Sequence, residues 1–303
     1  NYPITRREFL YRLAAFIGSA SIGLPVELCS PTYPKEARYY KKGKDNVVHC
    51  LLCPKGCIVP DGMRGYCEVR ENRNGVYYSL VYNRPCATNV DPIEKKPLFH
   101  FLPGTYTYSL ATVGCNIECK FCQNWEISQA LPEEVPFVDL KPEKVVREAI
   151  ENECRSIAYT YTEPVIFYEY VYDTAVIARK EGIKNVTVTN GFINQEPLKK
   201  LYSHIDATNV DLKGFTEKYY REITGSRLSP VLELLKTVKR MRVWVEITNL
   251  IVPGLNDDFD KIKEMCEWIK KNLGADTPLH FSRFFPDYLM RDISPTPKET
   301  LIK

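Results

Sequence analysis

Seven cysteines stand in two tight groups, and the second group has the spacing of a metal-cluster loop. Its members are Cys115, Cys119 and Cys122, a Cys-x3-Cys-x2-Cys pattern directly after the apolar, β-branched run YTYSLATV. Three thiolates this close can hold three corners of a cubane [4Fe–4S] cluster, and no fourth cysteine is within reach of the same loop. One iron would then be open to a small molecule, and Phe121 could pack against a flat ring of that molecule. A zinc ion, the alternative, would need a fourth protein ligand or water.

The first group has four members in the pattern Cys50-x2-Cys53-x3-Cys57-x9-Cys67, among glycines and prolines that favour tight turns. Four thiolates at this spacing form a tetrahedral site for zinc or for an iron–sulfur cluster. Spacing alone does not choose between the two metals, and buried free cysteines are the remaining alternative. We predict a small Cys-rich metal-binding module over residues 47–104.

Composition and charge restrict the class of protein. The 303 residues are 44% hydrophobic and 26% charged, which is typical of a folded globular chain. A net charge of +3 is too mild for a nucleic-acid binder, so no nucleic-acid partner is expected. Eleven cysteines, an odd number, do not match a disulfide-stapled secreted domain and indicate metal ligation instead.

The chain beyond residue 105 alternates between strand and helix patterns. Apolar and β-branched runs predict strands near 107–113, 155–161, 184–189, 206–212, 242–250 and 279–285. Helical patterns are clearest at 142–154, 165–181, 230–239 and 257–272. Six strand–helix units in series predict an α/β fold, in which a parallel sheet curves into a partial (β/α)6 barrel over residues 105–303. In such folds the chemistry lies on loops that follow the carboxyl ends of the strands.

Polar residues stand at these predicted strand ends. Glu163 follows the second strand and Asn190 follows the third, while the fourth strand ends in polar residues that share one face. The candidates for lining a cavity are Glu163, Asn190, Asn209, Asp211, Lys213, Thr248 and Arg283. Structural alternatives stay open: Glu163 could simply begin a helix, Lys213 could be solvated, and His280 is as typical of a core as of a site.

The two ends of the chain carry signals of their own. Arg6-Arg7 precedes the short apolar run 13–24, and residues 1–29 resemble a twin-arginine export signal. The expected location is the cell envelope, with membrane association through this segment; an amphipathic helix on a cytoplasmic protein is the alternative. Residues 30–46 are typical of a linker. The string 296–299 is a capping box that predicts a helix truncated at Lys303.

The residues around the second cysteine group resemble a known family. Residues 112–125 (TVGCNIECKFCQNW) are similar to radical S-adenosylmethionine (SAM) enzymes related to the pyruvate formate-lyase activating enzymes. The first cysteine group, the string DPIEKKPL at 91–98 and TYTEP at 160–164 narrow this resemblance to the AmmeMemoRadiSam system radical SAM enzymes. The resemblance covers residues 47–303.

The resemblance implies roles for the matching positions. The three cysteines of the second group would ligate the catalytic [4Fe–4S] cluster, Glu163 would meet the amino group of SAM, and Lys213 would face its carboxylate. The positions that would lie near SAM, and near a monovalent cation that related activating enzymes hold, are Asn190, Asn209 and Asp211. Thr248 stands where activating enzymes carry an arginine, which is a departure from the family pattern.

The resemblance also implies a function. It is the reductive cleavage of SAM at the cluster, which gives a 5′-deoxyadenosyl radical that abstracts hydrogen from a substrate, here expected to be a protein or peptide. The expected partners are a low-potential electron donor and Memo-like and Ammecr-like proteins. Two alternatives stay open: an activase that installs a glycyl radical, and a non-enzymatic electron-transfer or metal-binding scaffold.

Overall fold

A computed structural model describes residues 34–303, so the signal predicted over residues 1–29 lies outside the described part. A seven-stranded sheet forms its centre, in the order β13-β12-β11-β10-β9-β8-β7. The six parallel strands are β8 (Tyr106–Ala111), β9 (Ser156–Tyr159), β10 (Lys184–Thr189), β11 (Ala207–Asp211), β12 (Trp244–Ile251) and β13 (Leu279–Arg283). The strand β7 (Ala87–Pro92) pairs antiparallel with β8. The predicted α/β partial barrel is confirmed.

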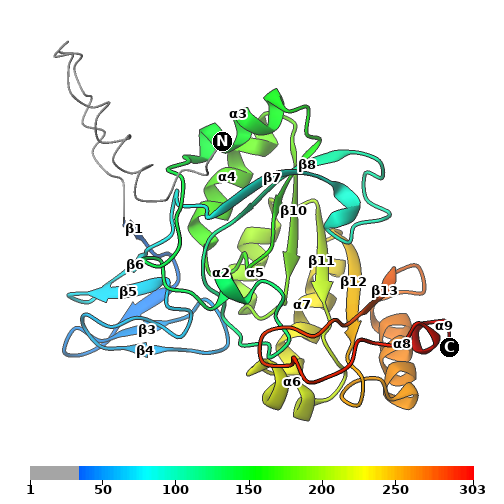
Figure 1. Ribbon diagram of the computed structural model, residues 1–303. Coiled ribbons are helices and arrows are strands. Elements are labelled where there is room, and N and C mark those ends of the chain that lie inside the picture. Colours follow the sequence, from blue (N-terminus) through cyan, green and yellow to red (C-terminus); the bar gives the residue numbers. More distant parts are fainter. Residues whose placement is uncertain (1–33) are drawn as a thin grey trace, which may run out of the picture. The chain divides into compact units, whose positions relative to one another are not determined.

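Helices connect the parallel strands, and Figure 1 shows α3, α4 and α7 behind the sheet. The helices are α2 (Trp125–Ser128), α3 (Pro142–Glu151), α4 (Tyr168–Lys180), α5 (Gln195–Tyr202), α6 (Glu217–Thr224), α7 (Leu228–Arg240), α8 (Phe259–Leu273) and α9 (Lys298–Ile302). Local chemistry explains where several begin. Pro142 occupies the first turn of α3, and the side chains of Thr216 and Asp258 accept backbone N–H groups at the starts of α6 and α8.

The Cys-rich region forms two small antiparallel sheets, which Figure 1 shows in blue and cyan beside the end where the parallel strands terminate. One sheet contains β1 (Lys35–Glu36), β6 (Val76–Ser79) and β5 (Arg70–Arg73); the other contains β2 (Tyr40–Lys42), β3 (Val48–Cys50) and β4 (Ile58–Val59). The strands β1 and β2 fall within residues 30–46, for which the sequence predicts a linker. The strand β1 forms because β6, far along the chain, supplies its pairing partner, which no local pattern reveals. The strand β2 instead pairs with the nearby β3 in a short hairpin, with Lys42 opposite Val48.

The segment 93–101, which we call the floor segment, packs against the inner face of the partial barrel. It begins with the 3-10 turn η1 (Ile93–Lys95). Ile93 and Leu98 are fully buried and form a core of their own with small side chains of β9, β10 and β11, namely Ala158, Val186 and Ala207. Lys96 is 1% exposed and donates to the Asp91 carboxylate at 2.7 Å. The inside of the barrel is therefore closed by chain that precedes its first parallel strand.

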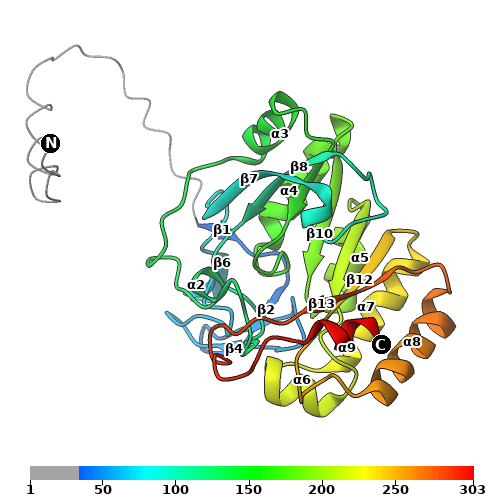
Figure 2. The ribbon, with the colours of Figure 1, turned by 45° about the vertical axis from the view of Figure 1, so that its right-hand side comes forward.

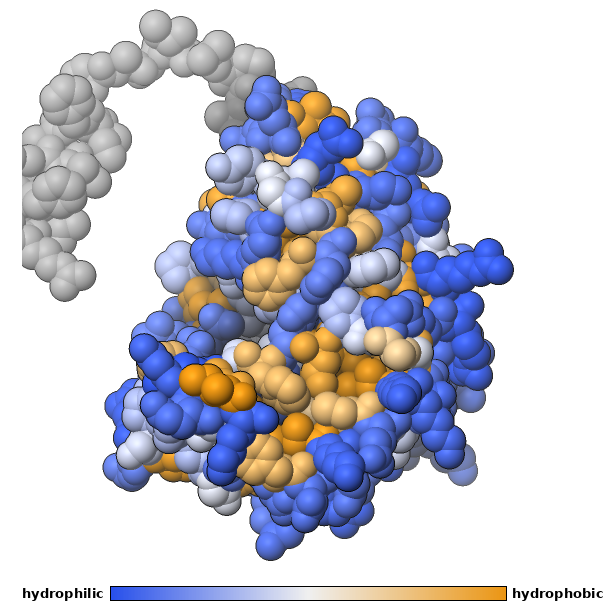
Figure 3. Space-filling model, turned by 90° about the vertical axis from the view of Figure 1, so that its right-hand side faces the viewer, coloured by the Kyte–Doolittle hydropathy of each residue, from blue (hydrophilic) through white to orange (hydrophobic). Residues whose placement is uncertain are grey.

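The opposite end of the sheet stays open at β13, which has a neighbour on one side only. Large apolar side chains near this edge are exposed, among them Phe281, Phe285 and Leu289. Figure 3 shows apolar side chains gathered around a hollow on this side of the molecule, and Figure 2 shows the C-terminal segment running across it. Within residues 34–303, no helix has the length and apolar character needed to cross a membrane.

Candidate functional site

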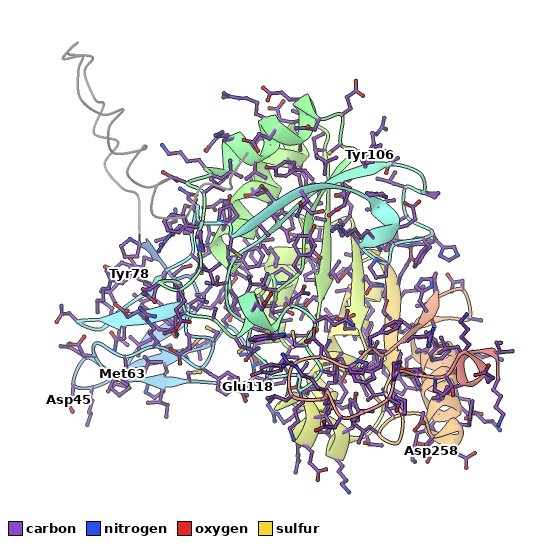
Figure 4. The ribbon with its side chains drawn as sticks, viewed as in Figure 1. Asp45, Met63, Tyr78, Tyr106, Glu118 and Asp258 are labelled. Carbon is purple, nitrogen blue, oxygen red and sulfur yellow. The ribbon has the colours of Figure 1, made fainter. Side chains whose placement is uncertain are left out.

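The second cysteine group lies on a loop that follows β8 and is tied to neighbouring elements through its backbone. The Gly114 N–H donates to the Ile127 carbonyl at 2.9 Å, and the Glu118 N–H donates to the Thr224 carbonyl at 2.9 Å. Figure 4 labels Glu118 between the Cys-rich sheets and the parallel strands. Gly114 has φ +95°, and a Cβ there would lie 2.9 Å from the Cys67 carbonyl oxygen. Only glycine fits, so the loop is packed directly against the Cys-rich module.

The three cysteines line one cavity of about 490 Å³ at the carboxyl ends of the strands. The Sγ of Cys115 lies 3.7 Å from Nδ2 of Asn190, and the Sγ of Cys122 lies 3.3 Å from Oγ of Ser128. Among the residues that line this cavity in the described chain, no fourth cysteine is present. Burial raises the pKa of the Cys119 thiol to about 12. A metal that binds the thiolate of Cys119 must therefore displace the proton of this thiol.

The spacing of the three sulfurs tests which metal group they fit. A tetrahedral zinc ion at 2.3 Å from each thiolate needs sulfurs about 3.8 Å apart. Within residues 34–303, these three sulfurs do not form a group whose members lie within 4.8 Å of one another. An arrangement without such a compact sulfur group suits a cubane cluster, which spreads its ligands more widely than a single zinc ion does. The residues present fit a [4Fe–4S] cluster with three protein ligands.

Glu163 follows β9 and is the buried acid of this cavity, with 2% exposure. Its carboxylate accepts the backbone N–H of Asn190 at 2.8 Å, the hydroxyl of Thr189 at 2.7 Å and the N–H of Val165 at 3.1 Å. Burial raises the pKa of Glu163 to about 7, and the three hydrogen bonds limit that rise. The side chain is fixed in place and keeps acceptor capacity toward the cavity.

Lys213 supplies the positive charge of the cavity. Its Nζ lies 3.0 Å from Oδ2 of Asp211, two residues earlier at the end of β11, and 5.7 Å from the centre of the Phe121 ring. Burial works against the charge, but the Asp211 carboxylate outweighs it and raises the pKa of Lys213 well above its usual value. The lining of the cavity thus contains both a protonated lysine and a buried acid.

Most of the residues that the sequence singled out meet in this cavity. Those that line it are Cys115, Cys119, Cys122, Phe121, Glu163, Asn190, Asp211, Lys213 and Thr248. Asn209 lies deeper and is fully buried, where its Nδ2 donates to the Pro97 carbonyl and to Thr248 Oγ1, both at 2.9 Å. It positions the floor segment and does not line the cavity.

Arg283 is the second predicted residue that the structure places outside the cavity. Its Nε donates to the Thr296 carbonyl at 2.8 Å. Side chains alternate along a strand, so Ser282, which does line the cavity, sends its neighbour to the other face of β13. The register of β13 decides which of the two adjacent polar residues, Ser282 or Arg283, faces the cavity, and the sequence pattern alone does not determine this register.

Sequence reasoning gave no role to several residues that line the cavity. Lys95 and Pro97 come from the floor segment, and Tyr161 comes from the loop after β9. The Tyr161 hydroxyl donates to the Asp91 carboxylate, which also holds Lys96. The string DPIEKKPL at 91–98 is one of the motifs that carry the family resemblance. That resemblance is the sequence signal that could have placed Lys95 and Pro97 at the cavity.

The first cysteine group lies in the small sheets and their turns. Cys50 and Cys53 are buried, while Cys57 and Cys67 are half-buried. Burial raises the pKa of both Cys53 and Cys67 to about 12. The Tyr66 N–H points to the Cys57 sulfur at 3.4 Å. These four sulfurs also form no group, among the described residues, whose members lie within 4.8 Å of one another.

A buried ion pair joins this module to the barrel. Arg70 of β5 lies with Nη2 at 2.5 Å from Oε2 of Glu169 in α4, and their side chains are 1% and 0% exposed. The Arg70 Nε also donates to the Ile166 carbonyl at 3.2 Å, and Glu169 accepts the Arg38 N–H at 2.9 Å. Burial raises the pKa of the Cys50 thiol, and the positive charge of Arg70 counteracts this rise because it favours the thiolate. The pair attaches the Cys-rich module to the barrel.

Parallel strands, a three-cysteine loop and an acid–lysine cavity at the strand ends together define a protein that binds a cluster and a small molecule. The chain matches the Radical SAM superfamily over residues 109–269 and belongs to it. Membership implies a [4Fe–4S] cluster and SAM, and the residues of the cavity fit both. The predicted relationship to the pyruvate formate-lyase activating enzymes is also confirmed.

Two relatives show the extent of the similarity. An uncharacterized protein of Methanocaldococcus jannaschii is 51% identical over 267 residues, which are 88% of this chain and 79% of that protein. The pyruvate formate-lyase 1-activating enzyme of Escherichia coli K12 is 28% identical over 163 residues, which are 52% of this chain and 65% of the enzyme. The structure of TYW1 with a lysine-pyruvate adduct matches with a TM-score of 0.49 and 17% identity, covering 71% of this chain and 80% of that one.

Proposed function

We propose that this chain holds a [4Fe–4S] cluster through Cys115, Cys119 and Cys122 and uses SAM to abstract hydrogen from a protein or peptide substrate. The observation that carries the proposal is the convergence of these three sulfurs, Glu163 and Lys213 on one cavity. The bound cluster and SAM supply the radical chemistry, and the protein supplies orientation and exclusion of water.

The charged groups of the cavity match the two charges of the methionine end of SAM. Glu163 is held by three donors and retains acceptor capacity for an ammonium group. Lys213 is kept protonated by Asp211 and offers a cation to a carboxylate. Phe121 gives an apolar ring beside the cation. The arrangement supports recognition of a zwitterion by its two ends.

The test is anaerobic reconstitution of the full chain, followed by dithionite and SAM, with 5′-deoxyadenosine as the measured product. The chain should form the product, and Cys122→Ser should form less than about 1% of it, because one of only three cluster ligands is lost. Cys266→Ser is the matched control, since Cys266 lies in α8 outside both groups. Absence of product from a fully loaded cluster, or unchanged product from Cys122→Ser, would overturn the proposal.

A protein substrate is supported by the relatives, because the name of the activating enzymes states that they act on pyruvate formate-lyase. Thr248 lines the cavity where such enzymes carry an arginine, which supports a substrate other than a glycyl-radical enzyme. We propose Memo-like and Ammecr-like proteins and a low-potential electron donor as partners. Mass spectrometry of these proteins after anaerobic incubation with the chain and SAM tests this. A new mass difference in a partner is expected, and a glycyl radical detected by electron paramagnetic resonance would favour the activase alternative.

We further propose that Cys50, Cys53, Cys57 and Cys67 hold a second iron–sulfur cluster and not zinc. The support is that, among the described residues, no three of these sulfurs form a group whose members lie within 4.8 Å of one another, whereas the sulfurs of a zinc–thiolate tetrahedron lie roughly 3.8 Å apart. Elemental analysis of the reconstituted chain should give about eight iron atoms per chain, and Cys53→Ser should lower this to about four. One zinc per chain, lost in Cys53→Ser, would contradict the proposal. A monovalent cation near Asp211 and export through residues 1–29 stay predictions.

A further inference from the structure

We propose that His100, Glu246 and His280 form a binding site for a first-row divalent metal ion, separate from both cysteine groups. The three side chains come from the floor segment, β12 and β13. One ligand atom from each lies within 4.8 Å of the other two. Nε2 of His280 is 2.7 Å and Nδ1 of His100 is 3.2 Å from the same Glu246 oxygen, Oε2. Two imidazoles and one carboxylate are a donor set that suits zinc or iron(II).

The burial of the three side chains suits a site that an ion can enter from solvent. The Glu246 side chain is 0% exposed, His280 is 20% exposed and His100 is 55% exposed. All polar partners found for Glu246 within residues 34–303 are N–H groups or imidazoles, and none is a lysine or an arginine. A negative charge buried without a cationic partner is costly, and a bound metal ion would supply the cation.

The hydrogen bonds around Glu246 exceed what a carboxylate can accept well. Oε2 faces the Phe99 N–H at 3.0 Å in addition to the two rings, while Oε1 faces the His100 N–H at 2.9 Å and Nε1 of Trp244 at 3.1 Å. Five nitrogen groups therefore surround a carboxylate that has about four lone-pair sites. If both rings turn lone pairs toward a metal ion, the crowding at Oε2 is relieved.

The distances are close to those of a coordination shell. Ligand atoms about 2.1 Å from a tetrahedral ion lie about 3.4 Å apart, so the observed 2.7 and 3.2 Å would need only a small outward shift of the side chains to admit an ion. The two imidazole planes differ by 20°, with centres 5.7 Å apart. Trp244 Nε1 and the His100 backbone N–H both donate to Oε1, the other carboxylate oxygen, and such hydrogen bonds are the usual support for a metal ligand.

An ion at this site would hold the floor segment against the strands β12 and β13. Glu246 lies two residues before Thr248 on β12, so both side chains are on the same face, and Thr248 lines the cavity above. His280 belongs to the edge strand β13 and His100 to the floor segment. The ion would join these two elements, which the backbone does not connect directly, at the open side of the barrel.

Zinc binding to the full chain, purified anaerobically with its clusters loaded, tests the site. After removal of loose metal with a chelator, the chain is dialysed against Zn²⁺ and analysed for zinc and iron. His280→Gln removes a ligand but keeps an N–H donor for Glu246. His204→Gln is the matched control, because His204 packs on Tyr172 outside this group. We expect one zinc equivalent in the chain and in His204→Gln, and an affinity more than about 100-fold weaker in His280→Gln.

A second variant guards against loss of folding. His100 is the most exposed of the three ligands, so His100→Gln should fold normally, with an unchanged far-UV circular dichroism spectrum and iron content. Zn²⁺ should raise the unfolding temperature of the chain but not that of His100→Gln. Equal zinc content in all four proteins, or equal loss in His204→Gln and His280→Gln, would overturn the proposal. Either result leaves the SAM-cleavage assay unaffected as a separate test of the proposed function.

Discussion

Replacing Arg70 by methionine should destabilise the chain strongly, because Glu169 would then remain as a buried charge. The two side chains are 1% and 0% exposed, with Nη2 and Oε2 2.5 Å apart and Nη1 3.3 Å from Oε1. Opposite charges about 3 Å apart attract by about 5 kcal/mol at an effective dielectric constant near 20. Removing one partner of a buried pair costs about 3–5 kcal/mol. Glu169 keeps the Arg38 N–H, so we expect a loss of about 3 kcal/mol in the free energy of unfolding.

Anaerobic urea unfolding, followed by far-UV circular dichroism, measures this loss. The double variant Arg70→Met/Glu169→Leu removes both charges and should recover most of it, since an apolar pair of similar volume is often neutral. Lys144→Met is the matched control, because the Lys144–Glu148 pair is 59% and 29% exposed and should contribute less than about 1 kcal/mol. A loss below about 1 kcal/mol for Arg70→Met, or a double variant worse than the single one, would refute the reasoning.

Two further substitutions test the floor segment and the cysteine loop. Asp91→Asn leaves the buried Lys96 ammonium without its partner and should cost about 3 kcal/mol in urea unfolding at pH 7. Burial raises the pKa of Asp91, but hydrogen bonds from Lys95, Lys96 and Tyr161 outweigh it and lower this pKa below its usual value. The stabilisation by the Asp91 carboxylate is therefore complete above about pH 4 and shrinks as the pH falls further. A loss of stability in Asp91→Asn that grows in acid would contradict this. Gly114→Ala should cost at least about 2 kcal/mol and lower the iron content, because its Cβ would meet Cys67 at a φ of +95°. Gly104→Ala, at φ +76° with open space around the Cβ, should cost about 1 kcal/mol, and equal losses for the two glycines would count against the contact.

The strand–helix alternation was predictable because most of the parallel strands, unlike the edge strand β13, are buried on both faces and give largely apolar runs. The ends of the strands were less so. The apolar and aromatic pattern of the second strand continues to Tyr161, but β9 stops at Tyr159 and Tyr161 has φ +63°, which turns the chain toward the cavity. The pattern of apolar side chains indicates which residues are buried. A strand, however, ends where its backbone stops pairing with the neighbouring strand, and the pattern does not show this point.

The cavity residues at strand ends followed from the rule that parallel strands place their carboxyl ends together. What the sequence could not supply was contact between segments far apart in the chain. The floor segment reaches the cavity through Pro97, which Asn209 holds from 112 residues away. Arg70 and Glu169 are 99 residues apart and share no pattern. Such contacts depend on the packed fold, and single-sequence periodicity carries no information about them.

The floor segment has a practical consequence for anyone who trims this protein. The stretch that matches the superfamily begins at residue 109, yet two residues that line the cavity, Lys95 and Pro97 of the floor segment, precede it. A shortened version starting at that boundary would expose Ala158 and Val186 to water, and the hollow would lack its base. The cavity thus depends on residues N-terminal to the matched stretch, and a shortened chain should start upstream of Asp91.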